Sequence, residues 1–475
     1  MKRPENVLVI MSDEHQARAL SCLGHPLVKT PNLDRLAARG TLFENAYTPS
    51  PICVPARAAF ATGQYPHQTG YWDNAIAYDG RVPSWGHVLQ QAGVRTASIG
   101  KLHYRAENDP TGFDEQIAPM HIHDGVGQVW AAVRNPLPEE KRTGRMLGQI
   151  GAGCSSYNDY DYRVCRETIA WLDRAASSEQ PWLLFSSFVA PHFPLTVPQK
   201  YLDLYKPATM PLSELRCENG YEIHPWMQRR QAFWNHDGLL RDDDERRLAM
   251  ACYFALCSFV DARIGRILDA LEATGQAENT LIIYTSDHGE CLGQRNTWGK
   301  SVLYGEATRV PLIMAGPGIG AGETCATPVN LIDVAPTLAE HFGQTPPAEW
   351  PGTSLLRRLQ APEDRAALVF SEYHAAESPT GAFMVADADW KYHYYVDYPP
   401  ELFDLAADPD ERVNLAGRPE YATQEARMHT ALLAICDPVA TDRAAKSDQD
   451  QLVAAWGGRE AALRSGVKGA SPVPV

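Results

Sequence analysis

In Val7-Leu8-Val9-Ile10-Met11-Ser12-Asp13, five apolar residues run directly into two polar ones. Short apolar runs of this kind are typical of strands that are buried on both faces of a parallel sheet. Four later runs, at 94–99, 182–189, 281–285 and 310–315, have the same form and also end in polar residues or glycine. The pattern therefore predicts a set of buried strands.

Helices are predicted between these strands. One begins after Thr30 with Pro31 at its first position, and we expect Gly40 to end it. A longer helix carries apolar residues three and four positions apart over 248–271, and Gly275 follows it. Alternating strands and helices predict an α/β fold, with a large mixed, mostly parallel sheet sandwiched by helices.

Chemically active side chains directly follow the predicted strands. They are Asp13, then Lys101 and His103, then His192, and finally Asp287 and His288. Because ligands bind at the carboxyl ends of strands in open α/β sheets, we expect these residues to share one site.

A cysteine motif, Cys53-Val54-Pro55-Ala56-Arg57, follows an extended, proline-rich approach and opens a predicted helix that runs to Gly63. Pro55 suits the first helical turn, and the helix N-terminus favours an anion beside Cys53. A lone cysteine is usually a small buried apolar residue. A Cys-x5-Arg thiol phosphatase would need arginine at position 59, which is Ala59, so that class is disfavoured.

The motif Cys-x-Pro-x-Arg resembles that of the formylglycine-dependent sulfatases of the alkaline phosphatase superfamily. The stretches 30–37 and 61–67 are similar to that family in order and distance. The resemblance implies an alkaline-phosphatase-like fold and oxidation of Cys53 to formylglycine by a formylglycine-generating enzyme. In that family one hydroxyl of the hydrated aldehyde attacks sulfur, and the other later expels sulfate by collapse of the hemiacetal.

The resemblance also implies a divalent cation held by Asp13, Cys53, Asp287 and His288. Many sulfatases have two adjacent carboxylates where this chain has Ser12-Asp13. The single Asp with a later Asp-His pair resembles the choline sulfatase and phosphonate monoester hydrolase branches, and calcium and manganese both stay open. Glu14 is expected to point away from Asp13 if the strand geometry continues.

The remaining site residues follow from the same resemblance. It implies that Lys101 and Lys300 bind sulfate and that Arg57 holds the diol and the helix end. It also implies that His103 removes the proton that collapses the hemiacetal, and that His192, with Lys300, protonates the leaving oxygen, for which a pKa near neutrality suits imidazole. Asn74 resembles an active-site asparagine of the choline sulfatase branch.

Three functions stay open at this point. The favoured one is a sulfuric ester hydrolase acting on a small aryl or alkyl sulfate, with choline sulfate as a candidate. The second is a phosphonate monoester or phosphodiester hydrolase, against which Lys101 and His103 argue because those relatives usually replace this segment. The third is an inactive binding protein with unmodified Cys53. Trp72, Trp130, Tyr157 and Trp298 either line a substrate pocket or belong to the core.

Changes in composition divide the chain into three parts. A catalytic domain is predicted over 1–345, an antiparallel-sheet subdomain over 346–436, and a polar tail over 437–475. Contact with a neighbouring subunit and mobility are the two alternatives for the tail. A homo-oligomer, either a dimer or a tetramer, is expected.

The chain has 475 residues and a formal charge of −15, so we expect no nucleic-acid partner and no membrane partner. The apolar run at 7–11 is too short for a signal-peptide core. The ten cysteines form no CxxC pair and indicate reduced thiols. Together these features predict a cytoplasmic protein.

Overall fold

The computed structural model describes residues 5–139, 141–142, 146–464 and 471–474. Its centre is an eight-stranded sheet in the order β11-β2-β10-β9-β1-β7-β4-β5. The neighbours β9, β1, β7, β4 and β5 run parallel, whereas β10 is antiparallel to both β9 and β2. The predicted mixed, mostly parallel sheet is confirmed. Its strands are β1 (Asn6–Asp13), β2 (Gly40–Phe43), β4 (Arg95–Lys101), β5 (Glu115–Met120), β7 (Trp182–Pro191), β9 (Thr280–Ser286), β10 (Leu312–Ala315) and β11 (Glu323–Cys325).

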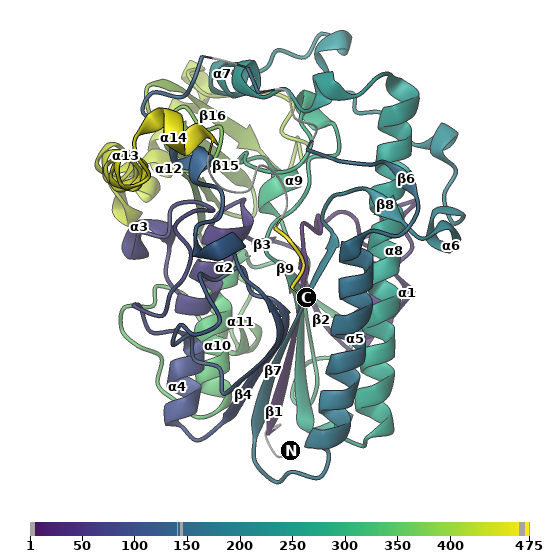
Figure 1. The fold of residues 1–475 in the computed structure, drawn as a ribbon. Coiled ribbons are helices and arrows are strands. Elements are labelled where there is room, and N and C mark those ends of the chain that lie inside the picture. Colours follow the sequence, from purple (N-terminus) through teal and green to yellow (C-terminus); the bar gives the residue numbers. More distant parts are fainter. Residues whose placement is uncertain (1–4, 140, 143–145, 465–470, 475) are drawn as a thin grey trace.

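Helices cover both faces of this sheet (Figure 1). Leu8 and Ile10 of β1 belong to the core beneath α1, α5 and α8, while Val7, Val9 and Met11 belong to the core beneath α2, α4, α10 and α11. Alternate residues of a strand point to opposite faces, so a strand that is covered on both sides must be apolar throughout. The helices are α1 (Pro31–Ala38), α2 (Cys53–Thr62), α4 (Trp85–Gln91), α5 (Ser156–Ala175), α8 (Asp243–Ala273), α10 (Val334–His341) and α11 (Leu355–Gln360).

Gly40 does not end the first helix as the sequence predicted. Helix α1 ends at Ala38, and Gly40 is the first residue of β2. A Cβ atom at Gly40 would lie 2.0 Å from the carbonyl oxygen of Met314 on the neighbouring strand β10. This glycine is therefore needed for the close approach of two strands rather than for a helix end.

A second sheet has four antiparallel strands in the order β13-β14-β15-β16, as the sequence predicted. Helix α12 (Ala422–Ile435) places Met428 and Leu432 against one face, and the other face packs on residues of the first domain that include Tyr47, Ile52 and Tyr304. The boundaries after residues 345 and 436 stay predictions. The strands are β13 (Val369–Tyr373), β14 (Ala382–Ala386), β15 (Trp390–Tyr395) and β16 (Tyr398–Asp404).

The polar segment after residue 436 is largely helical and packs on its own chain. It forms α13 (Pro438–Ala455) and α14 (Arg459–Arg464). Buried Arg134 donates to Gln449 Oε1 at 2.7 Å and pairs with Asp442 at 3.2 Å. Because polar groups make these contacts, the sequence showed no apolar core pattern there. Residues 465–470 and 475 of the predicted tail lie outside the described residues.

The shorter elements connect these parts. They are β3 (Ala46–Tyr47), β6 (Gly151–Ala152), β8 (Thr196–Val197), β12 (Val329–Asn330), α3 (Pro66–Thr69), α6 (Gln199–Leu202), α7 (Pro225–Phe233) and α9 (Gly305–Thr308). Among the described residues, α8 alone is long and apolar enough to cross a membrane, and 89% of its most apolar window is buried inside the fold. The core therefore accounts for its composition.

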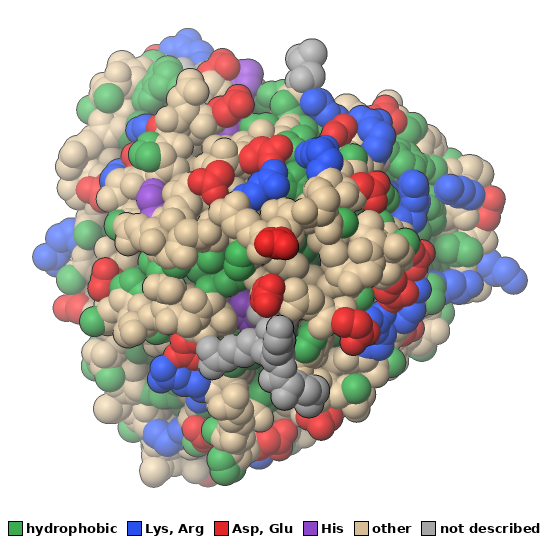
Figure 2. Space-filling model, turned by 90° about the horizontal axis from the view of Figure 1, so that it is seen from below, with side chains coloured by type: hydrophobic (Ala, Val, Ile, Leu, Met, Phe, Trp, Pro, Cys, Tyr) green, Lys and Arg blue, Asp and Glu red, His purple; other side chains and the backbone are tan. Residues whose placement is uncertain are grey.

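The surface carries charges of both signs. On the face shown in Figure 2, Lys and Arg side chains are interspersed with Asp and Glu side chains. This face shows no broad area of positive charge that would suit a polyanion.

Candidate active site

Four adjacent strands bring the predicted residues to one edge of the sheet. Asp13 ends β1 and Lys101 ends β4, while His192 directly follows β7 and Asp287 directly follows β9. These strands neighbour one another in the order β9-β1-β7-β4. The structure therefore gathers side chains that are far apart in the sequence.

Cys53 is the first residue of α2, as predicted, and every residue of this helix is buried. The preceding residue, Ile52, is extended, and Gly63 ends the helix with a φ of 65°, a left-handed conformation that favours glycine. Asn74 accepts a hydrogen bond from the backbone N–H of Val54 at 3.3 Å. A side chain from outside the helix thus binds a free amide of its first turn.

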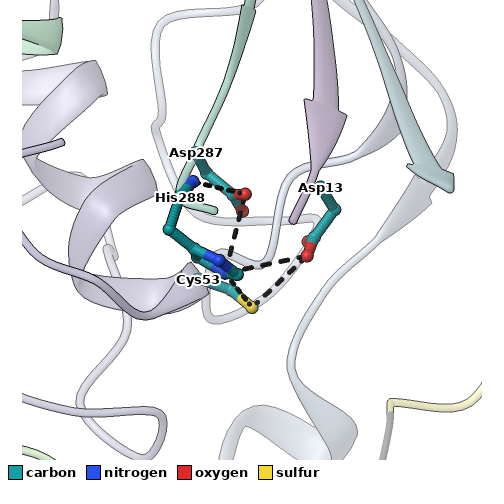
Figure 3. A group of neighbouring side chains, drawn as sticks. All are labelled: Asp13, Cys53, Asp287 and His288. Carbon is teal, nitrogen blue, oxygen red and sulfur yellow. Dashed lines mark hydrogen bonds and ion pairs between the residues drawn. The ribbon is translucent and has the colours of Figure 1, made fainter. Parts of the chain in front are cut away.

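Cys53 lies within a compact group of candidate metal ligands (Figure 3). Its Sγ atom is 3.1 Å from His288 Nε2 and 3.6 Å from Asp13 Oδ1. One ligand atom from each of Asp13, Cys53, Asp287 and His288 lies within 4.8 Å of the others. The His288 Nδ1–H donates to the Gly289 carbonyl at 3.0 Å, which leaves the Nε2 lone pair facing the group. Two carboxylates and this nitrogen fit a divalent cation.

Arg57 fixes both carboxylates of this group. It donates to Asp287 Oδ2 at 2.8 Å and to Asp13 Oδ2 at 3.2 Å, and it also donates to Ser187 Oγ at 2.9 Å. Burial alone would raise the pKa of Asp13, but Lys101, His192, Arg57 and Lys300 together hold it well below its usual value. Asp13 is therefore ionised.

The pKa of the Cys53 thiol is raised, whereas that of Asp13 is lowered. Burial and the charge of Asp13 raise its pKa to about 12, against the lowering effect of Lys300 and Lys101. An unmodified thiol here is protonated at neutral pH and is a weak nucleophile.

Lys101 and His103 line the cavity that adjoins Cys53. Lys101 Nζ lies 2.5 Å from Asp13 Oδ2. His103 Nε2 lies 2.7 Å from Ser471 Oγ. Burial and the charges of Lys101 and Arg57 set the pKa of His103 well below its usual value. His103 is therefore neutral.

Glu14 departs from the orientation expected of a continuing strand. Its φ of 69° breaks the alternation after Asp13, and its Oε2 atom lies 2.8 Å from Lys300 Nζ and 3.4 Å from His192 Nε2. Burial and the charge of Lys300 set the pKa of His192 well below its usual value, so the near-neutral pKa expected from the sequence is wrong for this site. Lys300 carries the positive charge there, since Cys53, Glu14 and Asp13 outweigh burial and raise its pKa.

One cavity is lined by Cys53, Asn74, Lys101, His103, His192 and Lys300, and also by apolar and aromatic side chains. Trp130 is the predicted aromatic residue that lines it. Trp72 instead donates to Asp448 at 2.7 Å, and Trp298 donates to Asp237 at 3.0 Å from within the core. Tyr157 donates to the carbonyl of Ser471 at 2.5 Å.

Several cavity residues were missed by sequence reasoning. Trp234 stands beside Trp130 with ring centroids 5.7 Å apart. Arg230 pairs with Glu377 at 2.7 Å, and His236 contacts the other oxygen of Glu377 at 3.1 Å. The missed residues lie in two distant segments, 230–236 and the loop at Glu377, with no shared motif, so no local signal could have joined them.

Comparisons with known proteins agree with this geometry. The family model described as Sulfatase matches residues 5–344, and the one described as N-sulphoglucosamine sulphohydrolase, C-terminal, matches residues 293–437. These features place the chain in the class of sulfuric ester hydrolases that have an alkaline-phosphatase-like fold. The chain belongs to the sulfatase family.

Relatives support the assignment over most of the chain. The choline-sulfatase of Rhizobium meliloti is 33% identical over 89% of this chain and 84% of its own length. Arylsulfatase K of Xenopus laevis is 29% identical over 88% of this chain and 80% of its own. The crystal structure of the phosphonate monoester hydrolase of Agrobacterium radiobacter has a TM-score of 0.74 at 26% identity, covering 91% of this chain and 95% of that one.

Proposed function

We propose that this protein hydrolyses a small aryl or alkyl sulfate monoester, with a formylglycine made from Cys53 and one divalent cation. The observation that carries the proposal is the position of Cys53 Sγ at the start of α2, within 4.8 Å of ligand atoms from Asp13, Asp287 and His288. Choline sulfate is a candidate substrate, supported by the relative named choline-sulfatase.

The formylglycine would supply a hydrated aldehyde whose hydroxyl attacks sulfur, and the cation, calcium or manganese, would be held by Asp13, Asp287, His288 and residue 53. Arg57 keeps Asp13 and Asp287 in place through bonds of 3.2 and 2.8 Å. Lys101 and Lys300 bind sulfate oxygens. A unit charge about 4 Å away contributes on the order of 4 kcal/mol at an effective dielectric of 20, before desolvation is subtracted.

His103, His192 and Lys300 are assigned to the proton-transfer steps of the reaction. His103 is neutral because of burial and nearby cations. We assign to it the proton released when the covalent sulfate is expelled. His192 and Lys300 stand together on the other side of the site through Glu14. We assign both residues to contact with the oxygen of the departing alcohol or phenol.

A phosphonate monoester or phosphodiester hydrolase is the second candidate, and its support is the phosphonate monoester hydrolase among the structural neighbours. Lys101 and His103 in the cavity favour a sulfate ester. A binding protein with unmodified Cys53 is the third candidate.

The test begins with protein made together with a formylglycine-generating enzyme and loaded with calcium or with manganese. Intact-mass measurement of the peptide that contains residue 53 reports conversion, because the aldehyde is lighter than the thiol. Converted protein should release sulfate from 4-nitrophenyl sulfate faster than it cleaves a phosphodiester of the same phenol. The reverse order would favour the second candidate, and no turnover by fully converted, metal-loaded protein would favour the third.

Assembly and location belong to the same proposal. We propose a cytoplasmic location, which the ten free cysteines support. A dimer or tetramer is the assembly proposed with it. Sedimentation of the purified protein and fractionation of cells that express it are the corresponding measurements.

A further inference from the structure

We propose that Glu14 is a positioning residue that holds Lys300 and His192 together against the oxygen of the leaving group. This proposal rests on the proposed function. It adds a residue that the family motif did not indicate, because the strand pattern predicts that Glu14 points away from the site.

Three segments of the chain meet at one carboxylate oxygen. Glu14 follows β1, His192 follows β7, and Lys300 lies in the loop before α9. Oε2 of Glu14 is 2.8 Å from Lys300 Nζ and 3.4 Å from His192 Nε2. The His192 Nδ1–H donates to the Phe193 carbonyl at 2.6 Å, so Nε2 is the ring atom left for Glu14 and substrate. Lys300 and His192 both line the cavity.

The backbone of Glu14 is fixed in an unusual conformation. A φ of 69° is uncommon for a residue with a side chain. Its N–H donates to Asp287 Oδ1 at 3.1 Å, and its carbonyl accepts from the Tyr253 hydroxyl at 2.7 Å. These bonds hold the turn that directs the carboxylate toward Lys300.

A second buried acid lies beside the carboxyl group of Glu14. Glu14 is completely buried, and its side chain also contacts the side chain of Glu290. Burying two neighbouring carboxyl groups costs free energy. A residue kept only for stability would not be expected to retain this cost, whereas one that orients two active groups could.

The role has a kinetic signature. When the nucleophilic oxygen bonds to sulfur, the S–O ester bond breaks and its electron pair stays on the departing oxygen, which then takes a proton. A nitrophenol departs readily as its anion, but an aliphatic alcohol needs the proton and positive charge of the Lys300 ammonium, beside which His192 Nε2 is held. Loss of Glu14 should therefore matter most for the poorest leaving group.

The experiment compares metal-loaded, converted wild type with Glu14→Gln on 4-nitrophenyl sulfate, phenyl sulfate and an alkyl sulfate. We expect kcat/KM to fall about tenfold or less on the first and about 100-fold or more on the last, the range of general acid catalysis. Lys300→Met should show the same selective loss. The double variant should lose much less than the product of the two single losses, because both changes break one contact.

Glu372→Gln is the matched control, since Glu372 is another completely buried carboxylate and contacts two histidines, His67 and His374. It should leave the ratio of rates across the three substrates unchanged. Glu14→Asp keeps the carboxyl group but shortens the side chain, so it should also show the selective loss. It replaces Glu14→Gln in the experiment if that variant does not fold.

The other possible results would refute either the positioning role of Glu14 or the proposed function. An equal loss on all three substrates, or no loss, would refute the positioning role while leaving the proposed function intact. A reduced cation content in Glu14→Gln would also refute it, because Glu14 would then be a metal ligand, as its place within 4.8 Å of Asp13 and His192 donors allows. Absence of sulfate release by the converted wild type would refute the proposed function and this role with it.

Discussion

Arg57 Nε donates to Asp287 Oδ2 at 2.8 Å, although 230 positions separate the two residues in the chain. The same guanidinium bonds to Asp13, which ends β1. Helix α2, which begins with Cys53, is therefore tied to the two carboxylates beside it. A buried cation therefore positions both carboxylates of the candidate metal site.

Replacing Arg57 by Ala should lower the free energy of unfolding by about 3–5 kcal/mol, because it takes the paired cation from buried Asp287 and one of the paired cations from Asp13, which still contacts Lys101. Urea unfolding measures this loss. Arg39→Ala is the control, since Arg39 forms an exposed pair with Glu272 and should cost at most about 1 kcal/mol. Equal effects of the two changes would contradict the role given to Arg57.

Calcium or manganese should raise the melting temperature of metal-free protein. At 100 times its dissociation constant, a bound ion adds about 2.7 kcal/mol of stability. Asp13→Asn should remove most of this gain, whereas Asp333→Asn, a buried aspartate that caps a distant helix turn, should keep it. Calorimetry with each ion would identify the preferred metal, and an unchanged melting temperature with both would argue against the cation site.

Trp130→Ala should raise KM for an aryl sulfate about tenfold and leave kcat within about twofold, because Trp130 lines the cavity with Trp234 and not the reacting centre. Steady-state kinetics on 4-nitrophenyl sulfate gives both constants. Trp456→Ala, at a side chain that is 37% exposed, is the control and should change neither. A fall in kcat alone would place Trp130 in the chemistry instead.

Stability should depend on pH through the pair formed by Glu372 and His67, whose side chains lie 2.8 Å apart. Burial alone would raise the pKa of Glu372, but His67 and His374 lower it from 4.5 to about 2. Glu372 therefore contributes about 3 kcal/mol to the free energy of unfolding. This contribution is fully present above pH 4.5 and is lost as the pH falls toward 2.

The His67 pKa is shifted the other way. Burial would lower it, but Glu372 outweighs burial and raises it above 6.5. Its contribution is complete below pH 6.5 and is lost as the pH rises through the folded value. The pair should therefore be strongest between about pH 4.5 and 6.5. Urea titrations that extend below pH 4.5 and above pH 6.5 should show a flatter profile for Glu372→Gln than for wild type, and identical profiles would exclude the pair as a source.

The sequence predicted the strands and the position of the site because both depend on local signals. The run at 7–11 and the residues after each strand can be recognised without tertiary information. So can the helix that begins at Cys53, with Pro55 in its first turn and Gly63 at its end. The orientation of Glu14 was missed because a single backbone turn reverses a strand's alternation. The pairing of Arg230 with Glu377 depends on the packing of two distant segments, which no local pattern encodes.

The packing of α13 was missed for a different reason. Its anchor is Gln449, a buried amide that bonds Arg134 and Asp73. A stripe of apolar residues at helical spacing indicates a helix that packs against a core. Because α13 packs through polar side chains, its sequence resembles that of a helix exposed to solvent.

The exposed fraction of Cys53 is only 2%. An enzyme that oxidises this thiol would have to reach the backbone around Cys53. In the folded protein that backbone is the first turn of a helix whose residues are all buried. The proposed conversion to formylglycine would therefore precede completion of folding. A chain that reaches its final shape too early would be trapped as a stable but silent molecule, so the rates of synthesis, folding and oxidation would together set the active fraction in the cell.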